Sequence, residues 1–407
     1  MVLVKGRQIF SVLLVALLAG CVSDKNQNEG PNYNYAPILN QNKTPNFEVS
    51  PLEEELQNNP ERVGCHGIGP VNLTQPPRSL NEIELIVPMG LMTGSHVTPV
   101  DHQYYYPPNW EYPTPEDKLV DVFAPADGVV SYINQMPDFF AQKNPNLGDY
   151  NFNIYHSCNF YTRWIHLYKL SPKLREVFKG KGPASVKAGE YIGAAGSFDF
   201  SVHDEERNLT GFISPNLYAN EPWKIHTMNP YDYFTEPVRS LLMNKTLRWT
   251  APIGGKIDYD VEGKLIGNWF VNNTNGYKGI KSPEYWVTHL SISPHPEDPT
   301  YTIISIGNFS GEAKQFGVKG GINPAEIGQK SGILKLELVD FEFLDDKGKI
   351  WDRKTYTHSL KVVDGQEIQG TILIEILSKN ILKVQVFPKK TANEVSGFTD
   401  DAVLYTR

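Results

Sequence analysis

The sequence has little positive charge and few of the short motifs that mark common catalytic classes. Lys and Arg number 38 against 46 Asp and Glu, which gives a net charge of −8 over 407 residues. No run of basic residues offsets this balance, so we expect no nucleic-acid partner. The chain also has no phosphate-binding glycine loop, no Gly-x-Ser-x-Gly turn and no Cys-x-x-Cys pair.

The N-terminus lacks an apolar run that is long enough to cross a membrane as a helix. Residues 9–18 are apolar, follow Lys5 and Arg7, and are followed by small residues, a pattern typical of an export signal. Leu18-Ala19-Gly20-Cys21 resembles the lipobox of bacterial-type lipoproteins. This resemblance implies a signal peptide at 1–20 and a lipidated Cys21 that anchors the exported chain to the membrane of a cell envelope or surface. The alternative is an N-terminal membrane-anchor helix.

Cysteine is scarce, with three residues in the whole chain. If Cys21 carries lipid, only Cys65 and Cys158 remain as thiols. An exported chain meets an oxidising compartment, so two remaining thiols favour one Cys65–Cys158 disulfide. The alternative is a pair of unbonded, buried cysteines.

Segments with a helical pattern are also few, and the many short segments of alternating polarity indicate a mainly β protein. Residues 21–62 are rich in Asn, Gln, Pro and Glu and predict a disordered tether, with a turn or two of helix within 51–59. We expect one β domain at 63–240, with a short helix near 170–178. Segments of alternating polarity at 241–407, including a hairpin around Glu262-Gly263, predict a second antiparallel domain, either a barrel or a sandwich.

The stretch 120–202 organises the first of these domains. The residues around Asp127-Gly128 have the pattern of a turn that leads into a strand. Residues 153–156 and 161–167 predict two strands joined by a turn at 157–159. A strand, a tight turn at Gly189 and another strand follow, and 198–202 alternates as a further strand.

In order and spacing these segments resemble the lysostaphin/LytM-type zinc metallopeptidases, which cleave peptide cross-links in cell walls. The matching segments are APADGVV, IYHSCNFYTRWIHLYKLS, VKAGEYIGAAGS, FDFSV and MNPYDYF, so the resemblance covers about 96–236. It implies a small antiparallel-sheet peptidase fold. It also implies a zinc site formed by a His-x-x-x-Asp motif and the second His of a His-x-His strand.

When the zinc site of that family is mapped onto this sequence residue by residue, several of its ligand positions carry other residues. His102 matches the first ligand, but Tyr106 stands where the Asp ligand belongs. Asp199 replaces the histidine ligand on the late strand, and Ser197 replaces the auxiliary histidine. His156 and His166 stand at family positions without substitution, and His166 corresponds to the catalytic histidine.

A rebuilt metal site is one alternative, formed by His96, Asp101 and His102 together with His166 and Asp199. The other is that these groups only hydrogen-bond one another and order the loop. Zinc is the cofactor that the resemblance implies.

Three functions follow from these observations. The first is a pseudoenzyme that binds a cell-envelope glycan, peptide or protein without cleaving it. The second is an active metal-dependent hydrolase with rearranged ligands. The third is a small-ligand binder that uses the C-terminal β domain, because Gly267-Asn268-Trp269 resembles the Gly-x-Trp motif of lipocalins. A Trp packed at the base of a barrel is the structural alternative to a ligand cavity.

Overall fold

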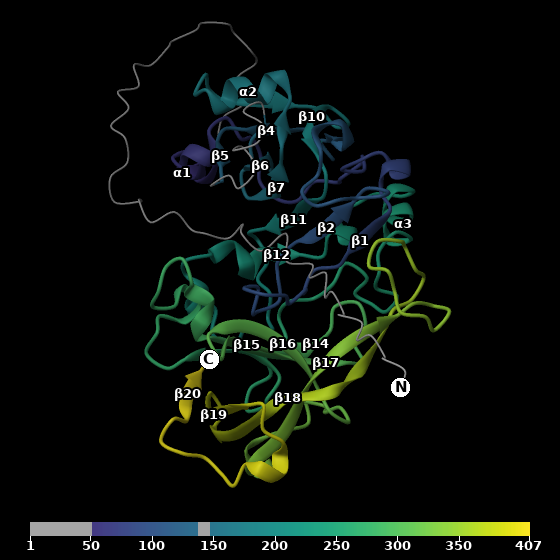
Figure 1. Ribbon diagram of the computed structural model, residues 1–407. Coiled ribbons are helices and arrows are strands. Elements are labelled where there is room, and N and C mark those ends of the chain that lie inside the picture. Colours follow the sequence, from purple (N-terminus) through teal and green to yellow (C-terminus); the bar gives the residue numbers. More distant parts are fainter. Residues whose placement is uncertain (1–50, 137–146) are drawn as a thin grey trace, which may run out of the picture.

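The computed structural model describes residues 51–136 and 147–407. Within these residues a nine-stranded antiparallel sheet occupies the first part of the chain (Figure 1). The main path runs in the order β1-β2-β11-β7-β6-β4-β9, with β12 paired to β11 and β5 paired to β6. The strands are β1 (Leu85–Val87), β2 (Gln103–Tyr106), β4 (Gly128–Val130), β5 (Ile133–Gln135), β6 (Tyr150–Ser157), β7 (Phe160–Leu167), β9 (Ala184–Val186), β11 (Phe198–Asp204) and β12 (Thr227–Met228).

A three-stranded sheet and short helices complete this part. The small sheet has the order β3-β10-β8 and consists of β3 (Val120–Phe123), β10 (Tyr191–Ala195) and β8 (Lys169–Leu170). The α-helices are α1 (Pro51–Gln57), α2 (Pro172–Phe178) and α3 (Val238–Met243). The 3-10 helices are η2 (Pro60–Arg62), η3 (Leu80–Glu82), η4 (Glu116–Lys118), η5 (Pro215–Tyr218), η6 (Pro222–His226), η7 (Pro230–Asp232), η8 (Gly276–Lys278), η9 (Tyr285–Thr288), η10 (Gln329–Ser331) and η11 (Ala392–Glu394).

The predicted helix near 170–178 is confirmed as α2. The Ser171 side chain accepts a hydrogen bond from the Leu174 amide, and Pro172 occupies the first turn, where a missing amide proton has no cost. The predicted turn at 157–159 is confirmed as well, because β6 ends at Ser157 and β7 begins at Phe160.

The predicted disulfide is also confirmed. Cys65 and Cys158 are bonded, and both are fully buried. The bond ties the segment after η2 to the β6–β7 turn. The described end of the predicted tether, 51–62, contains α1 and η2, and Arg62 pairs with Glu205 at 2.7 Å. Cys21 and the predicted signal peptide lie outside the described residues. No helix among the described residues is long and apolar enough to cross a membrane.

The last part of the chain is a closed barrel of eight antiparallel strands, which resolves the choice between barrel and sandwich. Its strands are β13 (Gly267–Val271), β14 (His289–Pro294), β15 (Thr302–Phe309), β16 (Glu312–Val318), β17 (Leu334–Leu344), β18 (Lys361–Ser378), β19 (Ile381–Pro388) and β20 (Val403–Thr406). Side chains from these strands, Trp269, Leu290, Ile304 and Phe316 among them, fill one buried core.

The hairpin predicted around Glu262-Gly263 is wrong. Residues 254–266 form turns and irregular chain, and the strand begins only at Gly267. Apart from the turn bond from Lys264 N to Val261 O, the amides at 260–266 that bond to backbone oxygens reach distant segments: Leu265 donates to Ile327 O and Asp260 donates to Gly211 O. Tertiary partners therefore override the local alternation.

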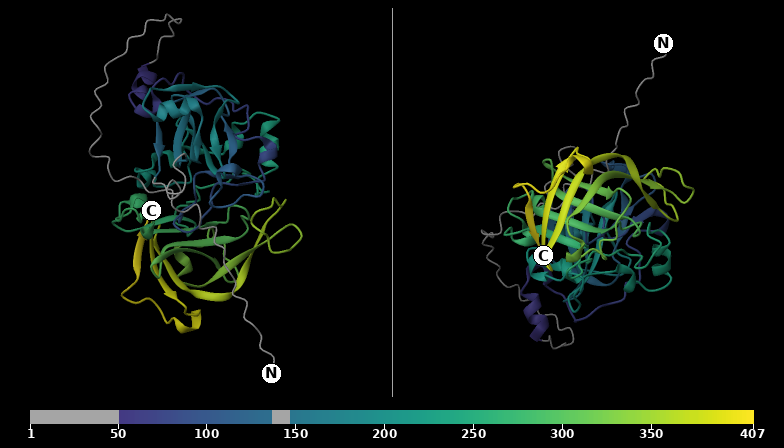
Figure 2. Two further views of the ribbon diagram at one scale, coloured as in Figure 1. Left: turned by 45° about the horizontal axis from the view of Figure 1, so that its top comes forward. Right: turned by 90° about the horizontal axis from the view of Figure 1, so that it is seen from below.

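The two parts share apolar clusters, so packing continues from one to the other. In Figures 1 and 2 the ribbon formed by β17 and β18 runs from the barrel toward β1. There Phe343, Leu360 and Val362 bury against residues of the first part, which include Leu85 and Tyr104. We call 341–364, the portion of this hairpin that reaches the first part, the arm.

Candidate functional site

Three adjacent strands bring the predicted site residues together. Asp199 of β11 lies opposite Tyr104 of β2 on one side and opposite Ile165 of β7 on the other. His102 immediately precedes β2, and His166 follows Ile165. Asp199 Oδ2 therefore lies 3.3 Å from His102 Nε2 and 3.7 Å from His166 Nε2. All three residues are buried.

Asp149 holds His166 from the other side. His166 Nδ1 lies 2.9 Å from Asp149 Oδ2 and 3.1 Å from Oδ1. Burial opposes protonation, but the charges of Asp149 and Asp199 outweigh it and raise the pKa of His166 to about 9. The residue also has a φ of +68°, in the left-handed region that non-glycine residues seldom adopt. Such a conformation persists only where its surroundings impose it, and it is frequent at functional sites.

Asp101 anchors the opposite end of the cluster. Its Oδ1 is 3.0 Å from His102 Nδ1, while its Oδ2 accepts a hydrogen bond from Trp223 Nε1 at 2.8 Å and lies 3.3 Å from Lys224 Nζ. Burial would raise the pKa of Asp101, but the Lys224 charge and the His102 bond hold it well below its usual value. Lys224 lies 3.3 Å from Glu221 Oε2 as well.

The cluster is thus one buried row of alternating acidic and basic groups. It runs Asp149, His166, Asp199, His102, Asp101 and Lys224, and we call it the charged row. Within the described residues two atoms of the row make no hydrogen bond, namely His102 Nε2 and Asp199 Oδ1. Burial raises the pKa of Asp199 despite the nearby histidines.

Tyr106, which replaces the family's Asp ligand, is a poor metal ligand here. Its ring packs 4.7 Å from Trp110 and 6.4 Å from Tyr104, measured between ring centroids. Burial and the charge of Asp199 raise the pKa of its hydroxyl, so the side chain is a neutral phenol. Zinc takes thiolate, imidazole and carboxylate ligands, and its catalytic sites use three of them. Across 51–136 and 147–407, no group of three His, Cys, Asp or Glu side chains is placed so that it could hold a metal ion. The residues present do not fit the zinc site that the resemblance implies.

The remaining predicted residues lie beside or away from the charged row. The His96 ring is 6.1 Å from the His102 ring, and the residue is partly exposed. His156 lies next to the β6–β7 turn, at the opposite end of this hairpin from His166. Its ring nitrogens lie 2.8 Å from Asp127 O and 3.0 Å from Thr162 Oγ1. Both nitrogens are thus occupied by hydrogen bonds that hold the fold together.

Asp149 and Lys224 of the row were not expected from the sequence, and neither were Trp223 and Glu221, which contact Asp101 and Lys224. They lie in or beside loops and short helices that carry no family motif. Trp223 and Lys224 lie in the segment WKIHTMNP, whose pattern alone predicts no site.

Comparisons with known proteins place the chain in no family. No protein-family model and no curated protein matches it. Among solved structures, it is similar to a chain of the structure described as the SpoIIQ–SpoIIIAH pore-forming complex, with 15% sequence identity and a TM-score of 0.25. The match covers 42% of this chain and 96% of that chain. A likeness this weak supports no argument about fold or function. The assignment as a mainly β protein rests on the sheets and the barrel of this chain.

Proposed function

We propose that the chain is an exported, lipid-anchored protein whose metallopeptidase-like part binds a component of the cell envelope without cleaving it. The component is a glycan, a peptide or another envelope protein. One observation carries this proposal: the groups at the family's ligand positions are paired with one another in the charged row. His102 and Asp199 lie 3.3 Å apart, and Tyr106 turns its ring into an aromatic cluster.

This arrangement is suited to rigidity more than to water activation. A catalytic zinc site keeps three protein ligands and an open fourth position. His102, Asp199 and His166 lie at this place, but among the described residues no three His, Cys, Asp or Glu side chains are placed so that they could hold a metal ion. The hydrogen bonds and close pairs between neighbouring members offset the cost of burying these polar groups, and they tie β2, β7, β11 and η6 together.

The second candidate, a hydrolase with rearranged ligands, has one observation in its favour. His102 Nε2 and Asp199 Oδ1 are buried and lack a hydrogen-bond partner within the described residues. Such atoms can bind an ion or a water molecule. They supply two ligands, one fewer than the three that a catalytic zinc site takes from the protein.

The third candidate, a small-ligand barrel, is not favoured by the packing around Trp269. Its indole Nε1 donates to Leu265 O at 3.0 Å, and the Arg407 guanidinium lies 3.9 Å from its ring centroid. Trp269 is fully buried within the barrel core. These contacts agree with a Trp that packs at the base of a barrel.

Metal content and cleavage are the decisive measurements. The full chain, purified in detergent, is incubated with excess Zn²⁺ and desalted, and its bound zinc is measured in parallel with His102→Ala, Asp199→Ala and the exposed control His358→Ala. We expect less than one tenth of an equivalent of zinc in every sample. We also expect retention of cell-envelope fragments with no new amino termini released. Stoichiometric zinc that both site variants lose and the control keeps, together with released termini, would establish the hydrolase instead.

The proposed anchor has its own test. Mass spectrometry of the N-terminal peptide is expected to show acyl chains on Cys21, and Cys21→Ser is expected to leave the chain unprocessed. An unmodified Cys21 in a membrane-bound chain would instead indicate an anchor helix.

A further inference from the structure

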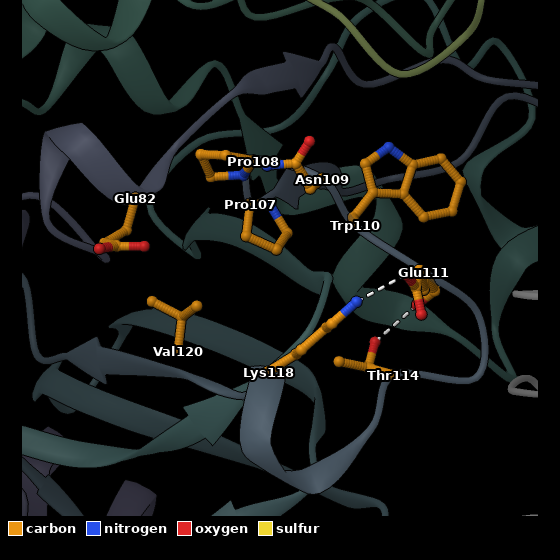
Figure 3. Close-up of a pocket in the computed structure, with 9 residues that line it drawn as sticks. All are labelled: Glu82, Pro107, Pro108, Asn109, Trp110, Glu111, Thr114, Lys118 and Val120. Carbon is orange, nitrogen blue, oxygen red and sulfur yellow. Dashed lines mark hydrogen bonds and ion pairs between the residues drawn. The ribbon is translucent and has the colours of Figure 1, made fainter.

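A pocket away from the charged row lies where the loop after β2 folds back over the start of β3. It has a volume of about 260 Å³ and is lined by Glu82, Pro107, Pro108, Asn109, Trp110, Glu111, Thr114, Lys118 and Val120. In Figure 3 the Glu82 carboxylate lies at one end and the Lys118–Glu111 pair at the other. Pro107, Pro108 and the Val120 side chain lie between them. The pocket therefore has an apolar middle and hydrogen-bonding ends.

The loop that forms the pocket is held in place by its own contacts. Lys118 Nζ donates to Glu111 Oε1 at 2.6 Å, and Thr114 Oγ1 donates to Glu111 O at 2.8 Å. A side chain at Gly196 would meet Thr114 Oγ1 at 2.0 Å, so the turn between β10 and β11 packs closely against the loop. Trp110 joins the loop to Tyr106, at 4.7 Å between ring centroids, so the pocket continues the aromatic cluster of β2. The site is largely formed before any ligand arrives.

The pocket is lined by two carboxylates, Glu82 and Glu111, and by one ammonium, Lys118. Glu111 pairs with Lys118 on its rim. Glu82 is exposed and faces the positive charge of Arg78, a fully buried residue whose guanidinium donates to Ala195 O at 2.8 Å. Arg78 Nε and Nη1 have no partner within the described residues. Burial lowers the pKa of Arg78 to about 9, with Glu82 and Asp121 opposing this, so the residue stays charged at neutral pH. An anionic ligand would meet two carboxylates, because Lys118, the one cation in the lining, is already paired with Glu111.

On these grounds we propose that this pocket binds one ring of a neutral saccharide. Sugar hydroxyls both donate and accept, so they match the Glu82 carboxylate at one end and the Lys118–Glu111 pair at the other. The C–H face of the ring matches the prolines and Val120. A volume of about 260 Å³ lies below the roughly 300–1,000 Å³ of pockets that take drug-sized ligands. It suits a single ring of a longer chain. This inference rests on the proposed function and selects the glycan among its envelope components.

A peptide fits the surroundings less well. An extended peptide commonly adds to an open strand edge. The strand nearest Glu82, β1, pairs with β2 on one side, and on the other Ile86 N donates to Lys245 O and Leu247 N donates to Ile86 O. Both edges of β1 are therefore occupied, and β3, the edge strand that contributes Val120, already donates from Phe123 N to Pro77 O.

Calorimetric titration of the full chain in detergent tests the proposal. The probes are tetramers of N-acetylglucosamine, glucose and mannose, and the peptide Ala-Glu-Lys-Ala. We expect saturable binding of at least one tetrasaccharide and at least a tenfold weaker Kd in Lys118→Met and in Glu82→Gln. The control Lys187→Met removes a comparable exposed lysine, which pairs with Asp127 at 2.7 Å on another loop, and is expected to bind as the parent does.

Three results would overturn the inference. They are no saturable binding of any tetrasaccharide by a folded protein, equal binding by parent and pocket variants, or binding of the peptide alone. Retention of whole envelope fragments is measured in the same samples. If fragments are retained while the saccharides fail, the pocket assignment falls and the proposed function stands. If neither the fragments nor the saccharides bind, the pocket assignment and the proposed function are both wrong.

Discussion

At the scale of single residues, the Tyr106 hydroxyl is buried and has no hydrogen-bond partner within the described residues. An unsatisfied buried polar group costs about 1–3 kcal/mol, so we expect Tyr106→Phe to stabilise the fold by about 1 kcal/mol. The matched control is Tyr231→Phe, because the buried Tyr231 hydroxyl bonds to Thr246 and its loss should destabilise. Urea unfolding measures both. Equal destabilisation by the two changes would show that Tyr106 has a partner after all.

Glu297 gives a pH-dependent prediction. It is buried between β14 and β15, with His295 Nδ1 3.9 Å from Oε2, and burial raises its pKa to about 7 in spite of Arg353. Because its folded pKa exceeds the unfolded value, the folded state binds more protons, and stability is lost as pH rises from about 4.5 to 7. The loss is about 3 kcal/mol at most, from about 1.4 kcal/mol per pKa unit.

The test is Glu297→Gln, which keeps the shape and removes the charge. Its advantage over the parent should be small near pH 5, grow toward pH 7 and then level off. Glu367→Gln, at an exposed position of β18, controls for the loss of one negative charge. A Glu297→Gln advantage that stays constant from pH 5 to pH 8 would contradict the raised pKa.

At the scale of elements, the disulfide links two segments that are 93 residues apart in sequence. Such cross-links commonly contribute about 2–5 kcal/mol. We expect Cys65→Ala, Cys158→Ala and the double variant to lose the same amount in this range, because either change removes the whole bond. Chemical denaturation measures the loss. A double variant as stable as the parent would show that the surrounding contacts already fix the β6–β7 turn.

The elements that could be predicted are those with local signals. Helix α2 has a Ser cap and a Pro start, and the β6–β7 turn has polar residues between two apolar segments. Asp199, His102 and His166 were expected together because the resemblance ordered their strands. Asp149 and Lys224 could not be expected, because their place in the charged row depends on how loops cross the sheet. The failed hairpin near Gly263 has the same cause, since its backbone partners lie far away in sequence.

At the scale of the whole molecule, the shared apolar clusters predict cooperative unfolding. The arm buries Phe343 and Val362 with Val87 and Tyr106, and a second cluster joins Met89 to Phe270. Hydrogen exchange should therefore give the same opening free energy for the cores of the sheet and the barrel. Phe343→Ala should lower both, while the exposed control Ile350→Ala should change neither. Two separate unfolding transitions in the parent would show that the domains are independent.

The arm also has a consequence for biosynthesis. The face formed by Leu85, Val87 and Tyr104 is made more than 200 residues before Phe343 and Val362, which cover it. During synthesis this apolar surface stays uncovered until β17 and β18 of the barrel have been made. An exposed surface of this kind invites aggregation. The order of the chain thus creates a period in which the newborn chain is open to aggregation, and a truncation before Phe343 would leave this face uncovered.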